Sequence, residues 1–201
     1  MGYELLIKLC DCIEPVTRTV IVPSKITFKR LADIINLIFG WENNPLHSFV
    51  FMNQPKIITS IEEQYQKIKD INASGSSKTK CSVSKSNGVL IDQYLKEQPS
   101  LQYFYGDNPP WEHVIEVIAI REDYREVYPK LLSFTGENVL NEAKGVTYFN
   151  ELTYYKQNNI ENSDLNALES KPKMNLNLVN IYLQASFFRR ILKGKKKEKK
   201  S

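Results

Sequence analysis

Two alternating segments followed by a helical repeat, at the start of the chain, constrain the fold most. Residues 3–9 and 16–22 place apolar side chains mainly at every second position, the period of a strand with one buried face. Apolar residues then recur at helical spacing over 28–39, with Thr27 as the N-cap and Gly40 as the stop. This ββα start predicts an α+β domain.

The rest of the chain continues with short strands and helices. Further strands are expected at residues 48–52, 57–59, 101–105 and 113–120, the last two as a hairpin. Further helices are expected at residues 89–97, 146–157 and 176–192. Residues 60–70 fit a helix or a strand, whereas 72–87, rich in Ser, and 128–145 are expected to be loops.

Both tryptophans and both histidines lie in two short segments, each at a turn that leads into an expected strand. Trp41 and His47 follow the first helix, and Trp111 and His113 lie in the turn and second strand of the hairpin. Together with Tyr105, these aromatic rings are typical of a ligand-binding surface. We therefore predict a binding groove whose residues are Trp41, His47, Tyr105 and Trp111.

The same segments offer a metal or acid–base site. His47, Asp107 and His113 would supply two imidazoles and a carboxylate, a set that suits zinc or iron with open positions. For acid–base catalysis the candidates are Asp107, Glu112 and His113. Neither segment has an HxH, HExxH or HxxxD spacing, so the ligands would have to converge from separate loops.

A structural interpretation of these residues stands beside the chemical one. His113 would be a buried, hydrogen-bonded histidine at the start of a strand, and Asp107 would cap the turn after Gly106. The sequence has no nucleophile elbow and no Gly-rich phosphate loop, so it implies no particular cofactor.

The positive charge of the chain is concentrated at its C-terminal end. The net charge is +4, but residues 189–201 hold eight cations and one acid, a net +7, which leaves −3 for residues 1–188. The cations are Arg189, Arg190, Lys193, Lys195, Lys196, Lys197, Lys199 and Lys200. Such a tail binds nucleic acid, an acidic protein or an anionic membrane surface, or is merely solvated. The apolar helix before it would pack on the domain or form a homodimer.

Composition excludes several classes of protein. The chain has no apolar run near the roughly 18 residues of a membrane span, and its first residues do not resemble a signal peptide. Its cysteines form neither a CxxC pair nor a disulfide framework, and Cys10 and Cys12 on a strand would be small apolar fillers. We expect a cytoplasmic protein without a transmembrane segment.

Shifts in composition divide the chain into four parts. These are an α+β domain at 1–157 with a flexible loop at about 72–87, a polar linker at 158–174, a helix at 175–193 and a disordered lysine tail at 194–201.

Taken in order, these motifs resemble the Ri-plasmid open-reading-frame-three-like family over roughly residues 3–152. The resemblance rests on the ββα start, Gly40-Trp41, Leu46-His47, Phe49, the Tyr/Gly-Asp/Trp-x-His stretch of 103–113, and Tyr128-Pro129. It implies an α+β fold with a curved, mainly antiparallel sheet packed on helices. Members of that family occur in bacteria and archaea, some on plasmids or as passengers of transposable elements, and the family has no established activity.

The chain departs from the family pattern at several polar positions. Pro45 stands where the family has the first histidine of His-Leu-His, and Phe104 replaces an aspartate. Pro109 and Pro110 resemble an insertion, and residues 139–145 lack most of the polar residues of the corresponding family loop. If the family's polar cluster is a working site, this chain has lost part of it.

These observations lead to two hypotheses for the function. The first is a non-enzymatic binding or accessory protein associated with mobile elements or nucleic acid, and the partner rests on the family resemblance. The alternative is a hydrolase-like enzyme that depends on a metal or on acid–base chemistry around His47, Asp107 and His113.

Overall fold

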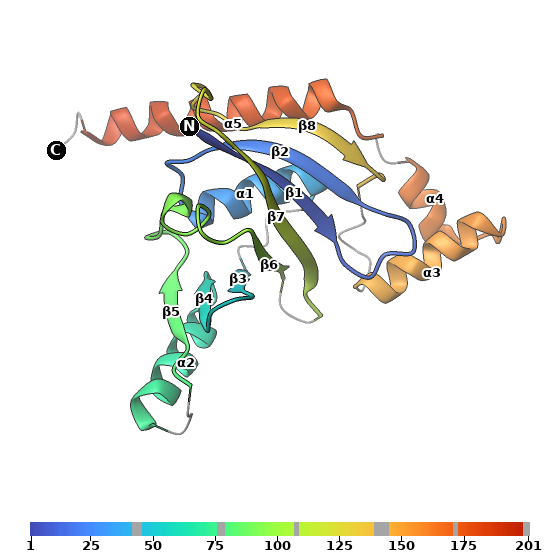
Figure 1. Cartoon of the computed structure of the whole chain (residues 1–201). Helices are drawn as coiled ribbons and strands as arrows, with labels where there is room; N and C mark the ends of the chain where they lie inside the picture. Colours follow the sequence, from blue (N-terminus) through green and yellow to red (C-terminus); the bar gives the residue numbers. More distant parts are fainter. Residues whose placement is uncertain (42–45, 76–78, 107–108, 139–144, 171–172, 199–201) are drawn as a thin grey trace.

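The computed structural model describes residues 1–41, 46–75, 79–106, 109–138, 145–170 and 173–198 (Figure 1). Its strands are β1 (Gly2–Leu9), β2 (Thr17–Pro23), β3 (His47–Phe51), β4 (Lys56–Thr59), β5 (Ser82–Lys85), β6 (Ser100–Tyr105), β7 (Trp111–Arg121) and β8 (Lys130–Thr135). Its helices are α1 (Phe28–Phe39), α2 (Glu62–Ser74), α3 (Val146–Gln157), α4 (Ser163–Ser170) and α5 (Leu176–Glu198), with a 3-10 turn η1 at Ile91–Gln93.

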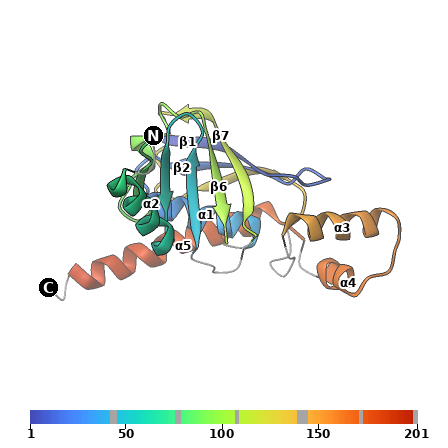
Figure 2. The ribbon, with the colours of Figure 1, turned by 90° about the horizontal axis from the view of Figure 1, so that it is seen from below.

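The described strands form one curved sheet in the order β5-β4-β3-β6-β7-β1-β2-β8. All neighbouring strands are antiparallel except β4 and β5, which are parallel. Helices α1 and α5 lie on the same side of this sheet (Figure 2), and their contact is made by Arg30 of α1, whose guanidinium lies 3.7 Å from the ring centre of Phe187 in α5. The α+β class and the mainly antiparallel sheet are confirmed.

The ββα unit forms for the reasons read from the sequence. Tyr3, Leu5 and Ile7 of β1 are fully buried because alternate residues of a strand face the same side. Helix α1 covers that side with one apolar stripe. Thr27 accepts a hydrogen bond from the N–H of Arg30 at its start, and the left-handed conformation at its end (φ 74°) falls on a glycine, Gly40.

Two expected loops contain strands. Lys130–Thr135 forms β8 within the segment 128–145, and Ser82–Lys85 forms β5 within 72–87, whose first residues belong to α2. The loop prediction was wrong there because β5 and β8 are the two edge strands of the sheet. One face of each is partly exposed, so their sequences lack strong apolar alternation and their hydrogen bonds to a neighbour decide the structure.

The chain is helical over more of its C-terminal region than composition suggested. Helix α4 lies inside the segment expected to be a polar linker, and α5 continues through Glu198, so residues 194–198 of the expected disordered tail are helical. Cys10 and Cys12 lie in the turn after β1 rather than on the strand, and both are half-buried free thiols. Within the described residues, no helix has the length and apolarity needed to cross a membrane.

The side chain of Asn180 in helix α5 is hydrogen-bonded to the edge strand β8. The Asn180 amide accepts a hydrogen bond from the N–H of Leu131 at 2.8 Å and donates one to its carbonyl oxygen at 3.0 Å. Leu131 is in the edge strand β8, so the amide takes the place of a neighbouring strand at this position.

We expect the substitution Asn180→Ala to lower the free energy of unfolding by about 1–3 kcal/mol, because the main chain of Leu131 loses both partners. Chemical denaturation followed by circular dichroism would measure the change. The matched control is Asn177→Ala on an exposed position of the same helix, expected within about 0.5 kcal/mol of the unsubstituted chain. Equal effects of the two substitutions would contradict this role for Asn180.

Candidate functional site

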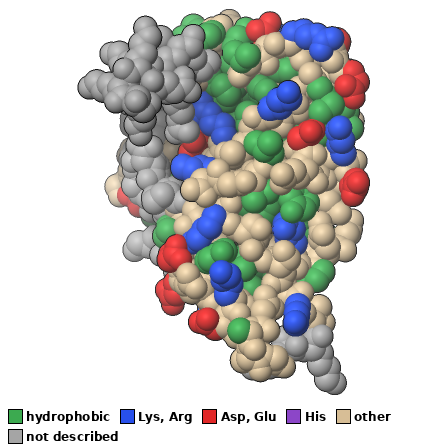
Figure 3. Space-filling view, turned by 90° about the vertical axis from the view of Figure 1, so that its left-hand side faces the viewer, with side chains coloured by type: hydrophobic (Ala, Val, Ile, Leu, Met, Phe, Trp, Pro, Cys, Tyr) green, Lys and Arg blue, Asp and Glu red, His purple; other side chains and the backbone are tan. Residues whose placement is uncertain are grey.

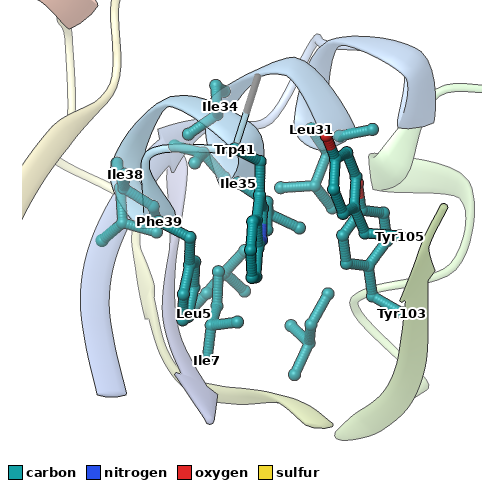
Figure 4. Packing of buried hydrophobic residues seen from close by; sticks show 14 of the residues in the cluster. Leu5, Ile7, Leu31, Ile34, Ile35, Ile38, Phe39, Trp41, Tyr103 and Tyr105 are labelled. Atoms are coloured by element: carbon teal, nitrogen blue, oxygen red, sulfur yellow. The ribbon is translucent and has the colours of Figure 1, made fainter. Parts of the chain in front are cut away.

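The two Trp/His segments meet in one buried aromatic cluster. The Trp41 ring lies between Phe39 and Tyr105, with ring centres 6.4 and 5.0 Å away and nearly parallel planes (Figure 4). The ring centre of Trp111 lies 4.8 Å from that of Trp41 and 6.3 Å from that of Phe149 in α3. Segments far apart in the sequence therefore converge here, as their composition suggested.

His113 is a buried member of this cluster with both ring nitrogens in hydrogen-bonding contact. Nε2 accepts a hydrogen bond from the indole N–H of Trp41 at 3.4 Å, and Nδ1 lies 3.3 Å from the carbonyl oxygen of Tyr103. A neutral imidazole with its proton on Nδ1 satisfies both contacts. Burial lowers the pKa of His113 to about 4, so the ring is uncharged at neutral pH.

His47 lies at a different polar cluster, on the other side of Tyr103. Its Nε2 is 2.9 Å from the hydroxyl of Ser86, and its main chain bonds to Ser60. The Tyr103 ring centre is 6.3 Å from that of His47 and 5.3 Å from that of His113. Both His47 and Ser86 are almost fully buried, so their contact belongs to the interior of the sheet–helix interface.

The carboxylates expected beside the histidines do not complete a ligand set among the described residues. Glu112 is exposed and alternates with His113 along β7, so it faces the opposite side of the sheet. Asp107 lies outside the described residues. In the part of the chain that the structure describes, no group of three or more His, Cys, Asp or Glu residues is placed to hold a metal ion.

The predicted groove residues are packed against one another. Trp41, Tyr105 and Trp111 are each 5% exposed, and His47 is 3% exposed. The sequence pattern identified correctly that the two tryptophans and Tyr105 lie together, but their rings fill the space between α1, the sheet and α3. A role for these four residues in holding a ligand stays a prediction.

Sequence reasoning missed Arg18, the largest fully buried side chain. Its guanidinium donates hydrogen bonds to oxygen atoms of the neighbouring Thr17 and of other segments: those of Ile38, Thr135, Gly136, Glu137 and the Asn138 side chain. Burial lowers the pKa of Arg18 to about 10, although the charge of Glu137 opposes this effect. The signal was available, since Arg18 shares the buried face of β2 with Val20 and Val22.

The cations of the predicted basic tail begin at the C-terminal end of α5. Those from residue 189 to residue 197 belong to this helix, whereas Lys199 and Lys200 lie outside the described residues. Figures 1 and 2 show the last part of α5 extending beyond the sheet. The structure thus separates this end of the helix from the buried aromatic cluster.

Comparison with known proteins agrees with the resemblance drawn from the motifs. The family model described as plasmid pRiA4b ORF-3-like protein matches residues 1–175. Among solved structures, the crystal structure of a protein of unknown function from Methanosarcina mazei Go1 matches with a TM-score of 0.64 and 16% sequence identity, covering 87% of this chain and 93% of that chain. This likeness shows a shared fold. No curated protein matches the sequence.

Because His113 is buried as a neutral imidazole, we expect the folded protein to lose stability in acid. The unfolded chain protonates this histidine near pH 6.5, whereas the folded chain does so only near pH 4. The free energy of unfolding should therefore fall as the pH drops from 6.5 towards 4, with roughly 3 kcal/mol from this group. Urea denaturation of the His113→Gln variant should show a flatter pH dependence, whereas the Asn177→Ala control, which removes no titratable group, should keep the original slope. An unchanged slope in His113→Gln would refute the assignment.

A second prediction concerns Arg18. The substitution Arg18→Met keeps an apolar stem but removes every N–H donor, so buried carbonyl oxygens of α1 and of the segment after β8 lose their partner. We expect the free energy of unfolding to fall by at least about 3 kcal/mol, measured by chemical denaturation. The control Arg125→Met, at an exposed position, should change it by less than about 0.5 kcal/mol.

Proposed function

The chain belongs to the plasmid pRiA4b ORF-3-like family, and from that premise we propose that it is a non-enzymatic, cytoplasmic accessory protein that binds nucleic acid through its C-terminal end. The association of that family with mobile elements suggests the partner. The observation that carries the proposal is the net +7 of residues 189–201, of which residues 189–198 form the end of a helix that extends beyond the sheet.

The charge of the rest of the molecule supports the choice of this end. Residues 1–188 carry a net −3, and Figure 3 shows Lys and Arg side chains interspersed with Asp and Glu over the face that it draws. A surface of mixed charge does not concentrate a polyanion, whereas a run of cations neutralises successive phosphates and releases their counterions. The tail is therefore the part of the sequence best suited to a phosphate backbone.

The buried cluster supports a structural role for the two histidines. His113 is neutral, its ring nitrogens are engaged by Trp41 and Tyr103, and His47 contacts the hydroxyl of a buried serine. A general base has to reach the proton that it removes, and a metal ligand needs a nitrogen lone pair directed at the ion. The contacts of His113 use both nitrogens within the core, which favours binding over catalysis as the function.

Salt dependence of nucleic-acid binding tests the proposal. Affinity of the full chain for duplex DNA and for single-stranded RNA should fall linearly with salt on logarithmic axes, with a slope near 0.9 per phosphate contacted in the duplex. Removal of residues 193–201 should weaken binding and flatten the slope. Fluorescence anisotropy at several salt concentrations measures both quantities.

A charge-matched control separates the tail from general electrostatics. Replacing Lys195, Lys196 and Lys197 by Gln should flatten the slope, whereas the same change at exposed lysines of the body, Lys67, Lys80 and Lys96, should not. Unchanged binding after removal of the tail, with the fold intact by circular dichroism, would refute nucleic-acid binding by this end.

A further inference from the structure

Helix α5 carries a second apolar stripe on the side that faces away from the domain. Its inward side is buried through Leu183 and Phe187, whereas the outer stripe is exposed and consists of Leu178, Ile181, Tyr182, Ala185 and Phe188. Phe188 lies at the edge of this stripe, where its ring centre is 6.0 Å from that of Tyr128. Ile181 and Tyr182 are 60% and 57% exposed, and Leu178 and Phe188 are 46% and 45% exposed. Single exposed apolar residues are ordinary, but a stripe along one helix face marks an interaction surface.

The spacing and the charge of the outer stripe indicate what kind of partner it fits. Leu178, Ile181, Ala185 and Phe188 follow one another at intervals of three, four and three residues, which is the spacing of the seam of a helix that packs on another helix. No charged residue occurs from Leu176 to Phe188. A helix that lies on a membrane carries its cations along the flanks of the apolar face, whereas here they begin after the stripe has ended.

We propose that the outer stripe binds the same stripe of a second copy of this chain, with the two α5 helices antiparallel about a two-fold axis near residue 183. The spacing is symmetric about that residue. Leu178 of one copy is then level with Phe188 of the other, and Ile181 is level with Ala185. The last pair places a large side chain against a small one, which lets the two helices approach closely.

Charge determines the direction of the pairing. In a parallel pair the two ends of net +7 would lie side by side and repel each other. In the antiparallel pair, the basic end of one copy extends past the N-terminal end of α5 in the other, the end that follows the acidic segment 137–170 in the sequence. That segment holds six acids and two lysines, a net −4. One of these acids, Glu137, is already placed at the start of α5, where its carboxylate accepts a hydrogen bond from the N–H of Met174 at 2.7 Å.

The dimer does not rest on the proposed nucleic-acid binding, and its test contains no nucleic acid. Sedimentation equilibrium of the full chain should show a monomer–dimer equilibrium that strengthens at low salt. Ile181→Asp places a charge in the centre of the stripe and should weaken dimerisation at least about tenfold. Met52→Asp, at an equally exposed residue of the turn after β3, should leave the dimerisation constant unchanged. Because both positions are exposed, both variants should keep the circular dichroism spectrum of the original chain and, at concentrations too low for dimerisation, its melting temperature.

Cysteine crosslinking tests the direction of the pairing. In a chain whose three native cysteines are replaced by serine, mixed Leu178→Cys and Phe188→Cys proteins should form a disulfide with each other faster than either forms with itself. A monomer at about 100 μM, or an unchanged dimer in Ile181→Asp, would overturn the proposal. A Phe188→Cys protein that crosslinks fastest with itself would overturn the antiparallel arrangement. A monomer that sediments with vesicles of anionic phospholipid, and loses this binding in Ile181→Asp, would assign the stripe to a membrane surface instead.

Discussion

The packing of this domain depends on one buried cation. The guanidinium of Arg18 is surrounded by main-chain oxygens from β2, from the end of α1 and from the segment after β8. Removing a cation from water costs several kcal/mol, so these oxygens have to be in place together. The contact at Ile38 also places the charge at the negative end of the α1 dipole. The docking of α1 and the closure of β8 against β2 therefore depend on one side chain.

Successive contacts connect Arg18 to the aromatic cluster. Arg18 lies over the ring of Phe39, 4.8 Å from its centre, and Phe39 contacts the imidazole of His113 edge-on at 4.8 Å. His113 in turn accepts the hydrogen bond of Trp41. Burial of the imidazole, and to a lesser extent the positive charge of Arg18, lower the pKa of His113 and disfavour a second cation here. This explains in physical terms why a histidine in the most conspicuous motif of the sequence is held neutral.

The sequence was most informative where a single element buries one face. Alternation in β1 and β2 and the stripe of α1 predicted the ββα unit, and the pairing of Trp41 with Trp111 predicted that their segments meet. A local sequence pattern could not predict that these rings are buried, because their burial depends on contacts with α3, a helix from another part of the chain. The edge strands Ser82–Lys85 and Lys130–Thr135 were missed for a related reason. Their structure comes from hydrogen bonds to a neighbouring strand, and single-sequence periodicity does not contain that information.

The amide of Asn180 has a consequence for how the sheet ends. An edge strand offers unpaired main-chain groups to any extended peptide, and β8 would add strands from other molecules if Leu131 were open. Asn180 occupies that position with a side chain that presents a donor and an acceptor but cannot propagate a ladder. Helix α5 thereby acts as a terminator of sheet growth. A chain cut before residue 176 would leave the main-chain groups of Leu131 open to an extended segment of another molecule.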